Sequence, residues 1–318
     1  MVSIWMDGRL VPESEAKVSV LAHTLHYGVG VFEGIRSYKQ PDGSAAVFRL
    51  EDHLHRLEDS ARICGLKLPF TRARLVAACI EVLEANGLKD GYLRPLIYQD
   101  DGKLLGLGAN PPSHVAIAAV PWGAYLGDEG LRRGIRVVFS AYRRSSLGSS
   151  LPKAKICGQY VVSTLAKREA VGMGFDEALL MDDEGCVAEG SGENLFIVRD
   201  GVLKTPPTSA PILPGVTRAT VLHLARCAAE ELDLSEIREE NITRGELLIA
   251  DEVFFTGTAA EITPIREVGL SVIGKGEPGP VTRALQQRFF GLVRGQATAP
   301  EHWRTGFGAA GAIQSPVR

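Results

Sequence analysis

Cysteine is scarce in this sequence, and its pattern excludes two kinds of stabilising site. The chain of 318 residues has five cysteines, at positions 64, 79, 157, 186 and 227, and no two of them form a Cys-x-x-Cys pair. An odd number without such pairs indicates neither a disulfide framework nor a zinc site. The histidine pairs 23/26 and 53/55 lack further ligands nearby, so we predict no metal and expect structural or surface roles for them.

Excess charge and long apolar runs are missing as well. The formal net charge is −3 at pH 7, which points neither to nucleic acid nor to an anionic membrane as a partner. No apolar run approaches the length of a transmembrane helix. The first residues lack the basic and apolar segments of a signal peptide. We therefore expect a cytoplasmic protein without a membrane segment.

The composition that remains is that of a globular protein with 45% hydrophobic and 23% charged residues. The length is sufficient for two domains with separate cores. Apolar periodicity and turn residues predict a small α/β domain over residues 1–120 and a connector over 121–134. A larger domain follows over residues 135–298. The glycine-rich stretch 299–318 is expected to be a tail that is flexible or an extension.

The small domain is predicted to start with a hairpin around the turn Asp7-Gly8. Residues 23–36 fit neither helix nor strand periodicity, so we expect a loop that lines a site. Helices are predicted over residues 51–64 and about 71–86, with Thr71 as the N-cap of the second. In the larger domain, further helices are predicted over residues 160–170, from about 216 onward, and over 280–294.

Lys155 is a candidate nucleophile. Its neighbours Ala154, Ile156, Cys157 and Gly158 are small or apolar, as they would be around a buried lysine. A lysine nucleophile must lose its proton, which requires desolvation or a nearby positive charge. Our hypothesis is that Lys155 holds a cofactor aldehyde as a Schiff base. An ordinary surface lysine is the alternative that this stretch alone favours.

A phosphate site can be assembled from two loops and one arginine. Gly215-Val216-Thr217 lies at a predicted helix N-terminus, where free N–H groups and the helix dipole favour an anion. Gly257-Thr258 follows a predicted strand and offers further N–H groups and a hydroxyl. Arg56 could add a bidentate guanidinium. Each part alone is weak, since a Gly-Val-Thr segment at a helix start is more often only a cap.

Two other glycine-rich stretches are rejected as nucleotide sites. Residues 269–276 have the glycine and lysine spacing of a P-loop, but Gly276 stands where Ser or Thr is required. Residues 28–34 imitate a dinucleotide fingerprint, but the last glycine comes one position late and no strand–helix unit surrounds it. We expect the first stretch to be a turn.

Several stretches together resemble one family. They are residues 27–36, 92–95, 121–127, 155–160, 189–196, 213–218 and 250–262. In this order, over about residues 4–296, they closely resemble the branched-chain amino acid aminotransferases, which are class IV, fold-type IV pyridoxal-phosphate enzymes. The resemblance implies an α/β fold of the α+β kind, with a smaller N-terminal α/β domain and a larger C-terminal domain. The cofactor would lie between them.

The resemblance implies that pyridoxal 5′-phosphate (PLP) is the cofactor. Lys155 would hold its aldehyde and later shuttle a proton. Tyr160 would hydrogen-bond the ring hydroxyl, and Glu189 would pair with the ring nitrogen and keep it protonated. The other implied cofactor contacts are Arg56, Leu213, Val216, Thr217, Gly257 and Thr258.

The implied reaction moves an amino group between L-leucine, L-isoleucine or L-valine and 2-oxoglutarate by a ping-pong mechanism, with branched-chain 2-oxo acids as products. Tyr92 and the backbone of residues 258–259 would bind the α-carboxylate. Arg94 would receive the distal carboxylate of 2-oxoglutarate. The full implied set of substrate residues is Tyr27, Phe32, Gly34, Arg36, Tyr92, Arg94, Tyr125, Thr258 and Ala259.

Some features leave other hypotheses open. After the lysine the family usually has a small residue, two glycines and Asn-Tyr, whereas this chain has Ile-Cys-Gly-Gln-Tyr over residues 156–160. A D-amino acid aminotransferase or an aminodeoxychorismate lyase remains possible within the fold type, although residues 32–36 argue against both. A non-catalytic cofactor carrier is a third hypothesis. We also expect a homodimer or higher oligomer, in which the loop 104–108 approaches the neighbour's substrate pocket.

Overall fold

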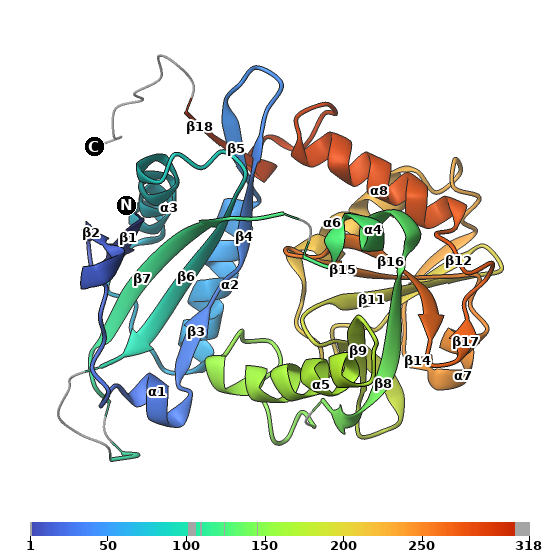
Figure 1. The fold of residues 1–318 in the computed structure, drawn as a ribbon, viewed down its shortest axis with the longest axis horizontal. Coiled ribbons are helices and arrows are strands. Elements are labelled where there is room, and N and C mark those ends of the chain that lie inside the picture. The colour runs from blue at the N-terminus through green and yellow to red at the C-terminus, as the bar shows by residue number, and fades with distance from the viewer. Residues whose placement is uncertain (1, 101–105, 109, 124, 145, 309–318) are drawn as a thin grey trace.

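Two β-sheets, lying side by side, organise the chain (Figure 1). The computed structural model describes residues 2–100, 106–108, 110–123, 125–144 and 146–308. Within these residues the first sheet has eight strands in the order β18-β5-β4-β6-β7-β1-β2, with β3 also paired to β6. The second has ten in the order β13-β12-β11-β15-β16-β8-β9-β10-β14, with β17 paired to β16.

The bounds of the elements follow the chain. The first sheet consists of β1 (Ser3–Met6), β2 (Arg9–Pro12), β3 (Gly30–Phe32), β4 (Ile35–Lys39), β5 (Ala45–Phe48), β6 (Gly91–Gln99), β7 (Ser113–Pro121) and β18 (Arg304–Phe307). The second consists of β8 (Ile135–Arg143), β9 (Glu177–Met181), β10 (Cys186–Gly190), β11 (Asn194–Arg199), β12 (Val202–Thr205), β13 (Glu236–Glu239), β14 (Ile242–Thr243), β15 (Glu252–Gly257), β16 (Glu261–Val268) and β17 (Ser271–Val272). The α-helices are α1 (His23–Tyr27), α2 (Leu50–Ile63), α3 (Arg72–Ala85), α4 (Gly127–Arg133), α5 (Tyr160–Gly172), α6 (Val216–Cys227), α7 (Arg244–Leu248) and α8 (Pro280–Val293).

The first sheet packs against α2 and α3. Asp7 and Gly8 both have positive φ, which is the geometry of a tight hairpin turn, and they connect β1 to β2 as predicted. The apolar faces of α2 and α3 share one core with Ile35 and Leu93 of the sheet. The predicted cap of α3 is confirmed, because the Thr71 side chain accepts a hydrogen bond from the N–H of Arg74 at 3.3 Å.

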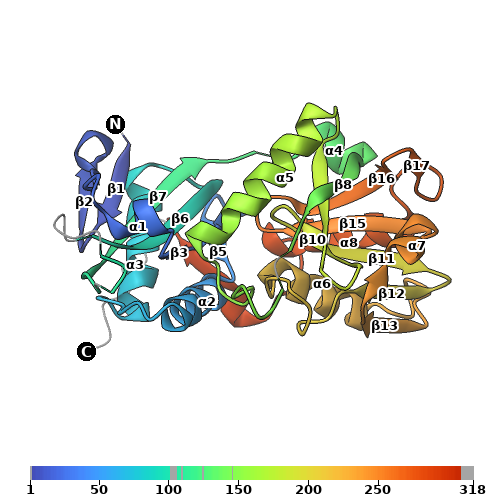
Figure 2. The ribbon, with the colours of Figure 1, turned by 90° about the horizontal axis from the view of Figure 1, so that it is seen from below.

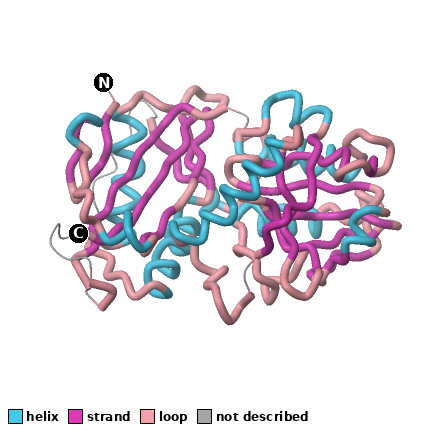
Figure 3. The backbone as a smooth tube through the Cα atoms, turned by 60° about the horizontal axis from the view of Figure 1, so that its bottom comes forward, coloured by secondary structure: helices cyan, strands magenta, loops and turns pink. Residues whose placement is uncertain are grey.

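The second sheet is covered by α6 and α8 on one side, through a core that includes Phe254, Leu222 and Leu285. Helix α5 packs on β8 and β9 through small residues such as Ala166 and Ala170. Figure 2 shows that the N-terminal end of α5 lies toward the first sheet, and Figure 3 shows the two groups of strands on either side of it. None of the described helices is long and apolar enough to span a bilayer.

The expectation of an irregular loop over residues 23–36 is wrong in part. This stretch contains α1, β3 and the start of β4, and both strands pair with β6. Gly28, at φ 69°, ends α1 after five residues, which is too short for a helical period to show in the sequence. Strand β3 is buried throughout, so it has no alternation of apolar and polar residues. Residues 33–34 separate β3 from β4 and interrupt their common pairing with β6.

The predicted tail also contains regular structure. Residues 304–307 form β18 and pair with β5, so the expectation of flexibility is wrong for them. Trp303 is 5% exposed, and its ring packs against Phe48 and beneath the guanidinium of Arg49. Trp303 and Phe307 are both buried, and they order this stretch without leaving a periodic pattern. Residues 309–318, and residues 104–105 of the loop expected near a partner, lie outside the described residues.

Trp303→Ala should lower the free energy of unfolding by about 3–5 kcal/mol, because the substitution leaves a cavity in a packed core. The measurement is urea unfolding followed by circular dichroism. Glu301→Ala, at an exposed position two residues earlier, is the control and should change stability by less than about 0.5 kcal/mol. Equal stability of the two variants would contradict the packing described for this segment.

Candidate active site

Lys155 is held in place through its backbone. Its N–H donates to Ser60 Oγ of α2 at 3.0 Å, and its C=O accepts from the N–H of Phe32 in β3 at 3.0 Å. Val31 and Ile156 form an isolated antiparallel bridge beside it. The loop that leaves the second sheet is therefore attached to the first sheet at this lysine.

The amine of Lys155 lies between two aromatic rings. Its Nζ donates to Tyr160 Oη at 2.5 Å and is 4.9 Å from the centroid of the Phe32 ring. The Phe32 and Tyr160 rings contact each other edge to face, with their centroids 4.8 Å apart. Tyr160 is the first residue of α5, which points its hydroxyl at the lysine. The amine is thus confined to one position with a hydroxyl as its partner.

Glu189 lies at the end of β10 and is 7% exposed. Its Oε1 pairs with Arg144 Nε at 3.0 Å, and its Oε2 accepts from the N–H of Leu213 at 3.2 Å and from Asn194 Nδ2 at 3.1 Å. Burial raises the pKa of Glu189, and the charge of Arg144 opposes that rise. Arg144 is itself anchored by Ser163 Oγ at 3.0 Å. The orientation of this carboxylate is therefore fixed.

The N-terminus of α6 offers backbone groups suited to an anion. Gly215 precedes the helix, and no side chain among the described residues caps it, so its first N–H groups remain available. Only glycine fits there, because a Cβ would lie 2.0 Å from Asn194 Oδ1. Arg56 is attached to the same point by a hydrogen bond from Nη1 to the C=O of Pro214 at 2.9 Å. Thr217 in the first turn is buried.

The turn between β15 and β16 completes this site. Gly257, Thr258 and Ala259 line one cavity together with Arg56, Lys155 and the start of α6. The two loops that the sequence proposed for a phosphate site therefore meet in space, with the arginine and the lysine between them.

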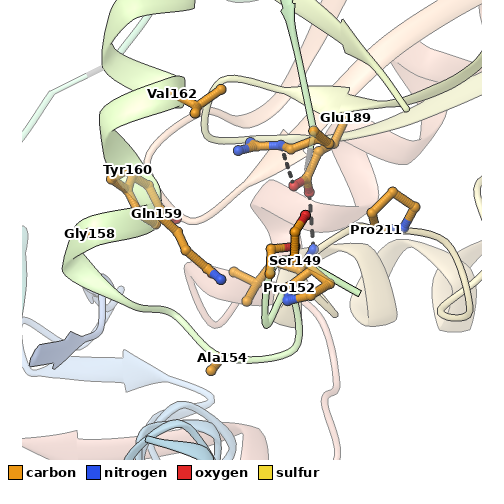
Figure 4. A pocket seen from close by; sticks show the side chains of 12 residues that line it. Ser149, Pro152, Ala154, Gly158, Gln159, Tyr160, Val162, Glu189 and Pro211 are labelled. Atoms are coloured by element: carbon orange, nitrogen blue, oxygen red, sulfur yellow. Dashed lines mark hydrogen bonds and ion pairs between the residues drawn. The ribbon is translucent and has the colours of Figure 1, made fainter. Parts of the chain in front are cut away.

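A second cavity adjoins the first at Leu213, which lines both. Tyr160 from α5 and Glu189 from β10 line it from two sides (Figure 4). Lys155 and the start of α6 thus line the first cavity, and Glu189 lines the second.

Gly34 and Tyr92 form a further wall of the first cavity. A Cβ on Gly34 would lie 1.9 Å from Tyr92 Oη, so a side chain there would displace the tyrosine. Arg94 Nη2 donates to Tyr92 Oη at 3.1 Å, and the guanidinium lies 4.8 Å from the centroid of the Phe32 ring. A tyrosine hydroxyl and an arginine are thus brought close to Lys155.

Comparison with known proteins points to one family. The family model for amino-transferase class IV matches residues 30–268. The branched-chain-amino-acid aminotransferase of Pseudomonas aeruginosa is 49% identical over 304 residues, which are 95% of this chain and 96% of that protein. The crystal structure of the Escherichia coli branched-chain amino acid aminotransferase has a TM-score of 0.89 at 44% identity, with 95% and 98% of the two chains covered. The PLP form of the Thermobaculum terrenum enzyme has a TM-score of 0.88 at 35% identity, with 96% and 98% covered.

This chain belongs to the class IV aminotransferases, in the branched-chain-amino-acid aminotransferase family. It is a transaminase with the class IV fold, and PLP is its cofactor. The predictions of family, fold class and cofactor are therefore confirmed.

The donor set of this aminotransferase fits PLP. The uncapped N-terminus of α6 beside Arg56 suits a phosphate group. The buried, oriented carboxylate of Glu189 suits a protonated ring nitrogen. Thr256 is one of the residues that line the first cavity, and its Oγ1 is buried without a partner among the described residues. No group of three or more His, Cys, Asp or Glu side chains in the described chain could hold a metal ion.

Five of the predicted substrate residues line neither cavity. Arg36 forms an ion pair with Glu261 at 3.2 Å, so its guanidinium lies against β16. Tyr27 and Tyr125 are 37% and 42% exposed. Phe32 contacts Lys155, and Arg94 donates to Tyr92, so both lie next to residues that line the first cavity. Gly34, Tyr92, Thr258 and Ala259 are the predicted substrate residues that line the cavity with Lys155.

The residues that hold Arg56 and Glu189 in place were not predicted from the sequence. Glu33 and His53 form a buried network with Arg56, and Arg144 and Asn194 hold Glu189. The spacing of His53 and Arg56, three apart on a predicted helix, was a usable signal for a shared partner. Nothing in the sequence marks Arg144, which lies between a strand and a serine-rich loop.

A second buried glutamate, Glu193, lies four residues beyond Glu189. It is 4% exposed, and its Oε2 accepts from the N–H of Gly192 at 3.0 Å. Burial and the nearby carboxylate of Glu177 raise the pKa of Glu193 from 4.5 to about 8. Lys167 is held by Glu177 at 2.7 Å and compensates only partly. Ionising Glu193 in the folded protein is therefore unfavourable.

Glu193 should make the protein less stable as the pH rises. Because the pKa of Glu193 is raised in the folded state, its stabilising contribution is complete below about pH 4.5. This contribution is lost as the pH approaches about 8. Glu193→Gln cannot ionise and keeps the acceptor for Gly192. The free energy of unfolding of this variant, relative to wild type, should increase between about pH 5.5 and about pH 8.5 in urea titrations. Glu184→Gln, which removes an exposed carboxylate, is the control, and a parallel response of the two variants would refute the prediction.

Proposed function

We propose that this transaminase moves the amino group of L-leucine, L-isoleucine or L-valine to 2-oxoglutarate in two half-reactions of a ping-pong cycle. One observation carries the proposal: Lys155, the anion site at α6 and the Gly34–Tyr92 wall line the same cavity. A cofactor phosphate, its aldehyde and an amino acid can therefore meet at one amine. The names of the relatives from Pseudomonas aeruginosa and Escherichia coli support the choice of branched-chain substrates.

Bound PLP supplies an aldehyde that accepts an amino group and a ring that withdraws electrons from the substrate. Arg56, Val216, Thr217, Gly257 and Thr258 would hold the phosphate. Leu213 would pack against the ring between the two cavities. Tyr160 would donate to the ring hydroxyl, and Glu189 would hold a proton on the ring nitrogen.

Lys155 Nζ would hold the cofactor at its aldehyde, and the free amine of Lys155 would serve as a base beside the α-carbon of the substrate. At Nζ, Lys155 would hold and release the α-proton that the reaction moves. Tyr160 and Phe32 confine Nζ to a small region, which limits the directions from which the proton can be taken. The stereochemistry of the reaction would follow from this confinement.

The substrate side must accept both an apolar side chain and a carboxylate. Tyr92 Oη and the backbone of residues 258–259 would bind the α-carboxylate common to all substrates. Arg94 would receive the distal carboxylate of 2-oxoglutarate, with Tyr27 beside it. The guanidinium of Arg94 lies over the rings of Phe32 and Tyr92, at 4.8 and 5.3 Å from their centroids. These rings stabilise the cation when no carboxylate is bound, so leucine does not have to meet an unscreened charge.

Tyr125 would close the apolar pocket, and Arg36 would support it through Glu261. The domains would be residues 1–120 and 135–298, joined by 121–134. The enzyme would work in the cytoplasm as a homodimer or larger homo-oligomer.

The absorption spectrum of the purified protein tests this function. L-leucine added without an oxo acid should bleach the visible band of bound PLP and produce the near-ultraviolet band of the pyridoxamine form. Subsequent 2-oxoglutarate should restore the visible band. Lys155→Ala should lose this leucine-driven change, because the proton shuttle is removed. Lys153→Arg is the matched control and should respond as wild type does, since it keeps a donor for the carbonyls of Ala210 and Ile212.

Two results would contradict the function. Bleaching by D-alanine but not by L-leucine would place the enzyme with the D-amino acid aminotransferases. A full response of Lys155→Ala would mean that another residue carries the proton.

Arg94→Gln should raise the KM for 2-oxoglutarate by about tenfold or more, because a charge-assisted hydrogen bond to its distal carboxylate is lost. The KM for 4-methyl-2-oxopentanoate, which has no second carboxylate, should change by less than about threefold and is the internal control. Steady-state kinetics with each oxo acid measure the difference. An equal rise for both oxo acids would show that Arg94 does not read the distal carboxylate.

A further inference from the structure

Glu33 is a buried carboxylate to which the reaction assigns no role. It is 0% exposed and lies in the two-residue break between β3 and β4. Its N–H donates to the C=O of Pro95 on β6 at 2.9 Å, which fixes its backbone. The break turns its side chain toward α2, where His53 and Arg56 lie.

The contacts of Glu33 orient one guanidinium. Arg56 Nε donates to Glu33 Oε1 at 2.6 Å, and Arg56 Nη2 donates to Glu33 Oε2 at 2.9 Å. His53 Nδ1 lies 2.8 Å from the same Oε2, and because a carboxylate only accepts, Nδ1 is the protonated nitrogen. Arg56 Nη1 donates to the C=O of Pro214. One N–H on Nη1 and one on Nη2 then remain without a partner among the described residues, and Arg56 is one of the residues that line the first cavity.

Glu33 is unsuited to moving protons. Burial alone would raise its pKa, but Arg56 and His53 hold the pKa of Glu33 well below its usual range. It lines neither the first nor the second cavity described above. Its carboxylate is therefore a permanent acceptor for Arg56.

We propose that Glu33 is a positioning residue that sets the orientation of Arg56 and thereby the retention of PLP. The proposal rests on the proposed binding of the cofactor phosphate by Arg56. A guanidinium held along its Nε–Nη2 edge can present its opposite end to an anion only in one direction. Without Glu33, Arg56 would keep its charge but lose the second anchor that directs it.

The same break also shapes the substrate side. The Gly34 N–H donates to Glu33 Oε2 at 3.2 Å, and Gly34 leaves the space that Tyr92 Oη occupies. The two-residue break between β3 and β4 thus turns Glu33 toward Arg56 and places Gly34 beside Tyr92. Displacement of Glu33 would disturb both Arg56 and the Gly34–Tyr92 wall, and activity would report the two effects together. Retention of the cofactor is therefore the more specific measurement.

The test compares the rate at which PLP leaves the holoenzyme in wild type, Glu33→Gln, Arg56→Gln and the double variant. Released PLP is measured by its absorbance after rapid filtration in the presence of excess inorganic phosphate as competitor. Glu33→Gln should lose PLP roughly tenfold faster, because one of two charge-assisted contacts to Arg56 is removed. In the Arg56→Gln background the same substitution should change the rate by less than about twofold, because Glu33 acts only through Arg56.

Glu252→Gln is the control for loss of a buried carboxylate away from the site. Glu252 accepts from the N–H groups of Val281 and Thr282 at the start of α8, so the variant should be less stable but retain PLP as wild type does. A Glu33→Gln effect that persists in full without Arg56 would overturn the proposal in favour of general damage to the fold. A wild-type rate for Glu33→Gln would also overturn it.

Two further outcomes distinguish a failure of the Glu33 role from a failure of the proposed contact between Arg56 and the cofactor phosphate. If Arg56→Gln loses PLP at the wild-type rate, the assignment of Arg56 to the phosphate fails, and the role of Glu33 fails with it. If Arg56→Gln loses PLP rapidly and Glu33→Gln does not, only the role of Glu33 fails. Should Glu33→Gln not fold, Glu33→Asp keeps the charge but is too short for the paired contact, and it should also lose PLP faster. Retention of PLP by Glu33→Asp at the wild-type rate would refute the positioning role.

Discussion

The attachment of the Lys155 backbone to the first sheet and its helix is the constraint on which the site depends. Lys155 belongs to a loop that follows β8 of the second sheet, yet its N–H bonds to Ser60 of α2 and its C=O to Phe32 of β3. Unpaired backbone groups at this depth would be costly, so the two hydrogen bonds hold the loop firmly. The amine consequently emerges where residues from both sheets can reach it.

Buried ion pairs surround this point. Glu33 pairs with Arg56, Glu189 with Arg144, and Arg36 with Glu261, and each pair joins segments far apart in the chain. Burying such charges contributes little net stability, because desolvation offsets most of the attraction. Their geometry, by contrast, is narrowly defined, because paired hydrogen bonds tolerate little rotation. The pairs therefore determine where functional groups point more than how stable the fold is.

Much of the fold was predictable from local patterns. The hairpin at Asp7-Gly8, the Thr71 cap and the helix that starts at Pro280 each follow from residue types whose backbone preferences are strong. The short α1 and the fully buried β3 were missed, because neither is long enough or amphipathic enough to leave a period in the sequence. The order of residues 299–308 was missed because it depends on Trp303 packing against Phe48, a contact between distant segments.

For the site, the sequence by itself determined the chemical groups: a lysine among small residues, a glutamate in a glycine-rich stretch and two loops suited to an anion. Each was visible because its chemistry depends on its immediate neighbours. Only the tertiary structure decided how these groups are oriented. Glu33 could not be connected to Arg56, nor Arg144 to Glu189, because the partners come from different elements and meet only when the sheets and helices pack. The same packing pairs Arg36 with Glu261, since side-chain direction depends on strand register and not on residue type.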